Sequence, residues 1–444
     1  MIPKNHKKQT SARPFPRRAP AMLAALLAGI PLSFHPLANP AARADGVTVS
    51  SDSSLKTEME SLTAGGTVSF TGAGTNSVLA APVTLTANPY VLNPGGAAHV
   101  TLTGNNATGV FENTAATAAD GTINLVLSNI AITDALGSSA IRSSAGAVNI
   151  TLAGAAGTTE LARNRNNGSD NAAPTFGGAA YGYTGITITG SQENLVLADN
   201  YGPRRGGGLY AENKTITINP VLSGTLLVTS NTANNSNGGA FSLAQSGTVI
   251  LSGTHKDILI QNNYCRNGQG GAISSGGALL IAPRVSGTFL VTSNSIASSG
   301  NGGAFYSQDA MTITANGPAG IRFENNAAVG VGGALCVNAS RIITLDAREG
   351  DIVFQGNVHT ADKVPNAIYG NAGGGTHNGN NTLVIQGGRD VLFFDPVYAS
   401  GTAEPLNTLL KTGAGTVLFS GSNSWRGSST VSAGALLVND GALL

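Results

Sequence analysis

Hydrophobic and polar residues alternate along this chain in short runs, and this two-residue period is typical of β-strands and not of helices. One stretch contains three such runs, Leu209–Ala211, Thr215–Ile218 and Thr225–Thr229. Turn-forming pairs such as Asn-Pro, Ser-Gly and Asn-Asn separate the runs in this stretch and in the next. The pattern therefore predicts three short strands in each period of about 31 residues.

Two motifs recur with the same period. The first is apolar-x-x-Asn, whose asparagines are separated by 36, 31, 32, 31, 32 and 31 residues. These asparagines are Asn164, Asn200, Asn231, Asn263, Asn294, Asn326 and Asn357. The second motif is a Gly-Gly step, which begins at Gly177, Gly207, Gly238, Gly270, Gly302, Gly332 and Gly373. Such strict recurrence indicates a fold built from stacked, equivalent units.

Three strands with regular turns would also fit a β-sandwich, but a sandwich gives no reason for the same Asn and Gly-Gly at every third strand. Stacked coils do, because they place equivalent positions above one another about 4.8 Å apart. We therefore predict an all-β fold, a right-handed parallel β-helix (β-solenoid) with about three short strands per coil; the hand follows the general preference of parallel crossovers. The asparagines are expected at corners, in the left-handed backbone region and bonded along a ladder. The glycines are expected where φ is positive or coils approach closely.

The first residues have the order of a secretory signal peptide. Basic residues precede an apolar run, Ala21–Ile30, and Ala42-Arg43-Ala44 fits a cleavage site. Residues 1–44 are therefore predicted to be removed, which leaves Asp45 as the first mature residue. No later run is long and apolar enough to predict a transmembrane helix.

A short helix is predicted directly after the signal peptide. The segment 52–62 places Leu55, Met59 and Leu62 on one helical face. The open end of a solenoid exposes unpaired strand edges and needs a cover. We expect this helix to cap the first coil.

Composition and charge narrow the range of functions. Gly accounts for 60 of 444 residues, charged residues for 11%, and the net charge is +1 with the basic residues scattered, so no nucleic-acid partner is predicted. Of the two cysteines, Cys265 is expected in a turn and Cys336 in a strand about two coils away. The implied separation of about 10 Å exceeds disulfide reach, so free thiols are predicted, one of them partly buried.

Candidate chemistry is sparse. The densest group of acids, Asp346–Asp351, is expected in a solvated turn between two strands, and Arg204-Arg205 in a solvated loop. The histidines His99, His255, His359 and His377 are too widely spaced for a local metal motif, and the last two are expected in exposed loops. We therefore predict no catalytic, cofactor-binding or metal-binding residues and no cofactor.

Two parts of the chain resemble known families. The alternation of Gly-Gly-Ala with Phe-x-x-Asn, best preserved at Phe323–Asn326 and Gly332–Leu335, resembles the passenger repeats of chlamydial-type polymorphic outer membrane proteins over residues 160–375. The stretch from Leu409 to Asn439 resembles the autotransporter-associated β-strand repeat. The resemblance implies a bacterial passenger domain (type V secretion), exported to the cell surface or outer membrane of a Gram-negative-type bacterium and normally displayed by a C-terminal β-barrel.

The domain plan follows from these observations. Residues 1–44 form the signal peptide, 45–160 the N-terminal cap and first coils, 161–408 the β-helix with the two motifs, and 409–444 the autotransporter-associated repeat, which we expect to be truncated.

The predicted function is a non-enzymatic, surface-displayed or secreted β-helical passenger, either adhesin-like or a stalk or scaffold. The alternative is a carbohydrate-active β-helix enzyme, a polysaccharide lyase or hydrolase. The expected partners are a host-cell or surface ligand, protein or glycan, and an outer-membrane β-barrel that is not in this chain. The loops 165–176 and 358–372 are the expected contact sites, because insertions can vary without disturbing the stack.

Overall fold

A computed structural model describes most of the chain after the predicted signal peptide. The described residues are 46–49, 55–62, 65–70, 76–85, 89–93, 99–113, 121–167, 176–338, 340–360, 363–370, 381–397, 408–423 and 427–439. The chain divides into two compact units, Met1–Arg43 and Ala44–Leu444, and the described residues belong to the second. The predicted signal peptide and its cleavage site lie outside the described residues. Among the helical segments that are described, none has the length and apolar character required to cross a membrane.

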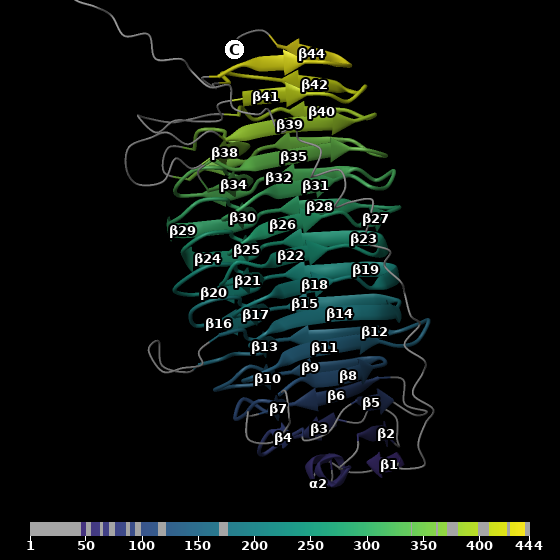
Figure 1. The fold of residues 1–444 in the computed structure, drawn as a ribbon. Coiled ribbons are helices and arrows are strands. Elements are labelled where there is room, and N and C mark those ends of the chain that lie inside the picture. Colours follow the sequence, from purple (N-terminus) through teal and green to yellow (C-terminus); the bar gives the residue numbers. More distant parts are fainter. Residues whose placement is uncertain are drawn as a thin grey trace, which may run out of the picture. The chain divides into compact units, whose positions relative to one another are not determined.

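The second unit is a stack of coils joined by parallel strand pairing (Figure 1). Each full coil contributes one strand to each of three walls, here called faces 1, 2 and 3. Face 1 consists of β1 (Gly46–Val49), β2 (Gly66–Phe70), β5 (Tyr90–Asn93), β8 (Ile123–Leu127), β11 (Ala147–Leu152), β14 (Gly185–Gln192), β18 (Thr215–Ile218), β22 (Thr248–Leu251), β26 (Ala278–Ile281), β31 (Met311–Thr314), β35 (Ile342–Ala347), β39 (Thr382–Gly387), β41 (Thr408–Lys411) and β43 (Ser429–Val431).

Face 2 follows face 1 in each coil. It consists of β3 (Asn76–Val78), β6 (Val100–Thr103), β9 (Ile130–Thr133), β12 (Thr158–Ala162), β15 (Asn194–Ala198), β19 (Val221–Thr229), β23 (Thr254–Gln261), β27 (Arg284–Val285), β28 (Phe289–Thr292), β32 (Ile321–Glu324), β36 (Ile352–Gln355), β40 (Val391–Phe393), β42 (Thr416–Phe419) and β44 (Ala435–Val438). Faces 1 and 2 form one continuous sheet because β14 pairs with strands of both.

Face 3 is a ten-stranded sheet of shorter strands. It consists of β4 (Val83–Thr84), β7 (Phe111–Asn113), β10 (Ile141–Ser143), β13 (Ala180–Gly182), β17 (Leu209–Ala211), β21 (Phe241–Leu243), β25 (Ile273–Ser275), β30 (Phe305–Ser307), β34 (Leu335–Val337) and β38 (Ile368–Gly370). The three strands predicted for the coil that begins at Leu209 are β17, β18 and the second half of β19. The prediction of a parallel β-helix is confirmed.

A short fourth ladder of six strands, which we did not predict, lies between faces 2 and 3 along the chain. It consists of β16 (Tyr201–Gly202), β20 (Thr232–Ala233), β24 (Tyr264–Asn267), β29 (Ser295–Ser299), β33 (Ala327–Ala328) and β37 (Val358–His359). Most of these strands are too short to produce a visible alternation, since two residues complete only one period.

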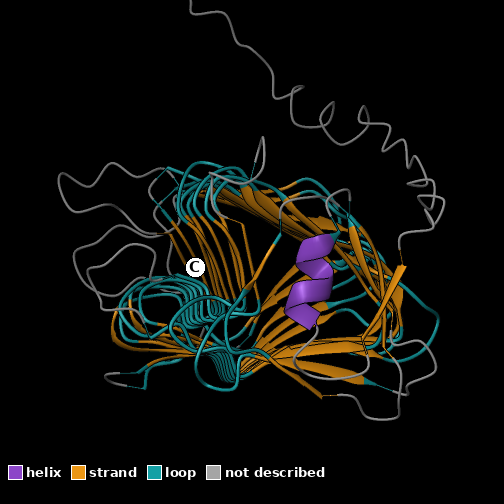
Figure 2. Cartoon of the chain, turned by 90° about the horizontal axis from the view of Figure 1, so that it is seen from below, coloured by secondary structure: helices purple, strands orange, loops and turns teal. Residues whose placement is uncertain are grey.

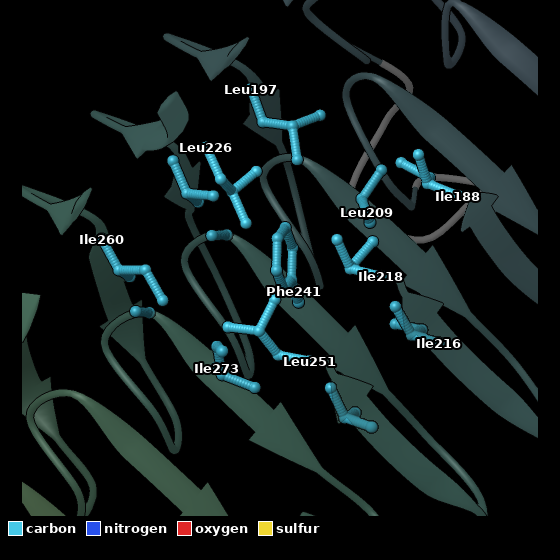
Figure 3. Close-up of a cluster of buried hydrophobic side chains, with 14 of the residues drawn as sticks. Ile188, Leu197, Leu209, Ile216, Ile218, Leu226, Phe241, Leu251, Ile260 and Ile273 are labelled. Atoms are coloured by element: carbon cyan, nitrogen blue, oxygen red, sulfur yellow. The ribbon is translucent and has the colours of Figure 1, made fainter. Parts of the chain in front are cut away.

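The interior is a continuous hydrophobic core that runs through the stack. Figure 3 shows how the faces share it: Ile218 of face 1, Leu226 of face 2 and Phe241 of face 3 point into the same space. Phenylalanines of face 2 stack on one another in the later coils, with ring centroids 4.9 Å apart from Phe323 to Phe354, and the same spacing continues to Phe393 and Phe419. This spacing matches that of the backbone ladder, so strand pairing and ring stacking reinforce one another.

The predicted asparagine ladder is present, and its members are fully buried. Each side-chain amide donates through Nδ2 to Oδ1 of the asparagine in the next coil, for example Asn200 to Asn231 at 2.9 Å and Asn231 to Asn263 at 3.0 Å. The backbone N–H of Asn200 also donates to the same Oδ1 of Asn231, at 3.2 Å. At its far end the ladder stops on a carboxylate, because Asn357 donates to Asp395.

The backbone conformation predicted for the asparagines is wrong. The left-handed residue at this corner is the one before each asparagine, as at Asp199, Ser230 and Asn262, where φ is 54°, 54° and 55°. A left-handed residue turns the chain at the corner, and the asparagine that follows can then point its amide inward along the ladder.

The local structure requires glycine at both positions of the Gly-Gly step. Gly238 has a φ of 69°, a backbone conformation that residues with a side chain rarely adopt. A Cβ on Gly239 would lie 2.1 Å from the carbonyl oxygen of Gly271 in the next coil. In one coil the predicted step is displaced by one residue, since the positive φ belongs to Gly206 and not to Gly207. Gly208 then takes the place that Ala240 occupies in the next coil.

The predicted capping helix is α2 (Leu55–Ser61). Leu55, Met59 and Leu62 are all buried and belong to the continuous core. Figure 2 shows α2 lying across the space that the strands enclose at this end of the stack. The helix thus covers the apolar interior of the first coils, as the sequence predicts.

Candidate functional site

The segments between each ladder asparagine and the following Gly-Gly step form a column on the outer side of face 3. We call this column the lateral lobe and define it by residues 201–205, 232–237, 264–269, 295–301 and 327–331. The central strands of face 3 are buried throughout, at outward as well as inward positions. Outward-facing Tyr306, Cys336 and Tyr369 pack with Val331 of the lobe. Face 3 therefore separates the main core from two small apolar clusters, this one and a cluster of Cys265, Ile296 and Ala328 within the lobe.

Backbone and side-chain hydrogen bonds order the surface of the lobe. The backbone N–H of Gln269 donates to Asn237 Oδ1 at 2.9 Å, and that of Asn301 donates to Gln269 Oε1 at 2.7 Å. The N–H of Val331 continues the series to Asn301 Oδ1 at 2.9 Å. These contacts repeat from coil to coil, so the lobe presents an ordered polar surface and not a set of independent loops.

An aromatic cluster lies where the lobe meets the first predicted contact loop, 165–176. The ring of Phe176 is 4.5 Å from that of Tyr210, which stacks on Tyr181 at 5.7 Å. Burial raises the pKa of Tyr181 to about 12, with a further contribution from the charge of Glu212, so this phenol stays neutral at physiological pH. Burial also raises the pKa of Tyr210, whose hydroxyl donates to the Glu212 carboxylate.

Arginines cover this aromatic cluster from outside. The guanidinium of Arg204 lies over the ring of Phe176, 5.5 Å from its centre, and that of Arg165 lies over Tyr201 at 5.8 Å. Arg204 is exposed, as predicted for a solvated loop, while Arg205 is half-buried and its Nε contacts Ser236 Oγ at 3.3 Å. Cation–π contacts of this kind orient a guanidinium without neutralising it.

The two predicted contact loops are described only in part. Of residues 165–176 the structure describes 165–167 and 176, and of residues 358–372 it describes 358–360 and 363–370. His359 was expected in an exposed loop, but it is half-buried in β37, and its N–H donates to the carbonyl of Val364 at 2.9 Å. His377 lies outside the described residues.

A recess lies at the corner between faces 1 and 2, with a volume of about 670 Å³. Its lining includes Val221, which is 53% exposed, and the ammonium-bearing Lys256. His255 also lines the recess, but its ring is buried and its Nε2 contacts the carbonyl of Ser252 at 2.9 Å. Burial lowers the pKa of His255, so the ring is neutral at physiological pH. The buried ring therefore offers the recess little direct chemistry.

The acid group 346–351 is not wholly the solvated turn that we predicted. Asp346 belongs to β35, is only 4% exposed, and forms an ion pair with Arg348 at 2.8 Å. The strand continues through Asp346 because the residue pairs with Thr314 and Gln386 in the neighbouring coils. Glu349 does lie in the turn and pairs with Arg284. The described residues hold no group of three His, Cys, Asp or Glu side chains close enough together to bind a metal ion.

Both cysteines are free thiols, as predicted, but their placement differs from the prediction. Cys265 belongs to β24 and is fully buried against Ile296 and Ala328, whereas a turn was expected. Cys336 is buried in β34 of face 3. Neither thiol is partly exposed.

The fold and the repeated corner motifs define the chain as a parallel β-helix of stacked, equivalent coils. Comparison with known families then gives a match to the Passenger-associated-transport-repeat over residues 409–438. The matched repeat forms β41 to β44, which pair with β39 and β40 and so extend faces 1 and 2.

Two curated relatives are outer membrane proteins of Chlamydia pneumoniae. The chain is 33% identical over 105 residues to the probable outer membrane protein pmp10, and 32% identical over 127 residues to the probable outer membrane protein pmp8. The matched stretches cover 22% and 25% of this chain but only 11% and 13% of those relatives. No solved structure matches. The repeat and the relatives support an outer-membrane or cell-surface localisation.

Proposed function

We propose that this chain is a non-enzymatic passenger segment that is displayed on the bacterial surface and binds a partner through the lateral lobe. The observation that carries the proposal is the continuity of the stack. The transport repeat at 409–438 pairs with β39 and β40, which in turn pair with β35 and β36 of the coils that carry the asparagine ladder, as in Val384 with Leu410 and then Thr430. One uninterrupted sheet therefore joins the repeat associated with transport to the coils that carry the lobe.

An outer-membrane β-barrel is the translocator we propose for display. A β-helix suits this route because each coil pairs with the coil already formed, so folding can proceed one coil at a time as the chain emerges. The lobe is the proposed contact surface because it is the part of each coil outside the three faces. Its polar and cationic side chains vary from coil to coil. The ladder asparagines and the Gly-Gly residues, in contrast, serve the stacking of one coil on the next.

Surface display is tested on intact cells of the source bacterium with an antibody raised against purified protein. We expect labelling of intact cells, and loss of that labelling after brief treatment with an external protease. A periplasmic protein serves as the control and should be labelled only after the outer membrane is permeabilised. Labelling of this chain that requires permeabilisation would contradict the proposal.

The non-enzymatic character is tested separately with the purified chain. Incubation with a panel of acidic and neutral polysaccharides should release neither reducing sugar nor unsaturated product above a heat-denatured control. Release that depends on folded protein would overturn this part of the proposal and favour a carbohydrate-active enzyme.

A further inference from the structure

The lateral lobe has an unbalanced charge. Its described residues include Arg204, Arg205 and Arg266 and not a single Asp or Glu. Glu212 follows the lobe in the chain, and its carboxylate accepts a hydrogen bond from the hydroxyl of Tyr210. Five arginines elsewhere on the stack are paired with carboxylates, as Arg284 is with Glu349 and Arg322 with Glu324. The lobe is therefore a cationic strip on a chain whose net charge is close to neutral.

These arginines are distributed along the axis of the stack. Arg204 follows β16 and Arg266 lies in β24, and these two strands are separated by β20 alone. With neighbouring strands about 4.8 Å apart, the two positions are separated by about 10 Å along the axis. Arg165 in the preceding coil extends the strip by one more step. A ligand that contacts all of them has to be extended and to follow the axis.

The guanidinium groups are held in place but not neutralised. Arg204 lies over the ring of Phe176, and Arg205 contacts the hydroxyl groups of Ser236 and Tyr210. Nη1 of Arg266 lies 3.4 Å from Asn234 Oδ1. Each guanidinium carries five N–H donors, so one or two such contacts leave most of them for an anionic ligand. Pre-orientation of this kind reduces the entropy lost on binding.

The polar surface around the arginines is rich in amides and hydroxyls. Asn235, Asn267 and Ser298 follow one another in successive coils, and Nδ2 of Asn267 lies 3.4 Å from Asn235 Oδ1. Such groups both donate and accept hydrogen bonds, which suits a ligand that carries many hydroxyl groups along with its charges.

We propose, building on the surface display proposed above, that the lateral lobe binds an extended anionic polysaccharide that lies along the coil axis. Its carboxylate or sulfate groups meet Arg204, Arg205 and Arg266, and its hydroxyl groups meet the amides between them. Single-stranded nucleic acid fits less well, because its binding sites usually offer exposed aromatic rings for base stacking. Tyr181 and Tyr210 beside these arginines are buried, and the tyrosines of the lobe itself, Tyr201 and Tyr264, are half-buried.

The test uses the purified full chain and four probes: heparin, which carries sulfates and carboxylates, hyaluronan, which carries carboxylates alone, neutral dextran, and single-stranded DNA. We expect saturable binding to heparin or hyaluronan that weakens as salt is raised, and no binding to dextran. Binding of heparin but not hyaluronan identifies sulfate as the recognised group, and comparable binding of both identifies carboxylate. DNA that binds as tightly as either polysaccharide would overturn the proposal, as would the absence of binding to both.

A matched pair of variants locates the site. Arg204→Gln combined with Arg266→Gln should weaken binding at least 10-fold, while Arg284→Gln combined with Arg322→Gln removes the same charge from outside the lobe and should change it less than 2-fold. Equal losses in both double variants would overturn the assignment to the lobe. Unchanged circular dichroism and thermal midpoints verify folding. Because binding is measured in solution, its failure is distinguishable from failure of surface labelling on cells.

Discussion

The asparagine ladder makes a quantitative prediction about stability, which we develop for Asn263 in the middle of the stack. Its Nδ2 donates to the carbonyl of Val228 at 3.0 Å and to Asn294 Oδ1 at 2.9 Å. Its Oδ1 accepts from the backbone N–H and from Nδ2 of Asn231, at 3.1 and 3.0 Å. The substitution Asn263→Ala therefore removes four contacts from a fully buried site.

The loss of stability in Asn263→Ala depends on which buried groups lose a hydrogen-bond partner. Nδ2 of Asn231 keeps the carbonyls of Leu197 and Thr229, and Asn294 Oδ1 keeps the backbone N–H of residue 263. The backbone N–H of Asn231 and the carbonyl of Val228 lose these contacts. At about 1–3 kcal/mol for each of these two groups, the free energy of unfolding should fall by about 2–6 kcal/mol.

The adjacent residue provides a matched control. Asn262 is exposed and has a φ of 55°, so Asn262→Gly removes the same side chain without backbone strain. We expect it to lower the free energy of unfolding by less than about 1 kcal/mol. Urea denaturation followed by circular dichroism compares the two variants. Hydrogen exchange should show faster exchange in the coils around residue 263, because a stack of repeats can open locally.

The reasoning would be refuted if Asn263→Ala and Asn262→Gly lowered the free energy of unfolding equally. That result would mean that strand pairing and the apolar core hold the corner without the amides. A cost well above the expected range, with loss of folded protein in most preparations, would instead mean that the ladder is needed for the coils to form.

Three further predictions concern single sites. Gly239→Ala should prevent stable folding, since its Cβ would lie 2.1 Å from the carbonyl oxygen of Gly271, whereas Gly388→Ala, with open space around it, should be tolerated; thermal melts of both variants decide this. Burial raises the pKa of Asp395, opposed by N–H donors from Gly356 and Asn357. A raised pKa in the folded state means that ionisation costs stability, so from pH 7 to pH 4 the wild type should gain stability relative to Asp395→Asn, and no gain in urea titrations would contradict this. Burial raises the pKa of Cys265 to about 12, so iodoacetamide at pH 8 should label this thiol only after denaturation, and rapid labelling of the native chain would show that the site opens.

The sequence predicts those parts of the fold that a strict repeat specifies. Strands of four or more residues with alternating burial, such as β18 and β22, can be predicted from the order of residues along the chain. Gly238 and Gly239 are visible because one needs a positive φ and the other has no room for a Cβ. The position of the capping helix follows in the same way from the helical spacing of Leu55 and Met59.

The remaining features depend on contacts between coils. The left-handed residue before each asparagine is Arg, Asp, Ser, Asn or Gly in different coils, so no residue type marks it. The burial of Asp346 depends on partners in two other coils, including Gln386. The lobe was missed as a unit because its arginines are far apart in the sequence, and only the stacking brings Arg204 within two coils of Arg266.

The central claim is that the transport repeat continues the same β-helix as the coils before it. Paired cysteines test the register directly, in a background that carries Cys265→Ala and Cys336→Ala. Val384 and Leu410 are partners in adjacent coils, while Val384 and Thr430 are two coils apart. Strand spacing of about 4.8 Å lies within disulfide reach, and twice that distance does not. Mild oxidation and mass spectrometry of the folded chain should therefore show an intramolecular disulfide in Val384→Cys/Leu410→Cys and none in Val384→Cys/Thr430→Cys. A bond in the second variant, or no bond in either, would contradict the stacked register.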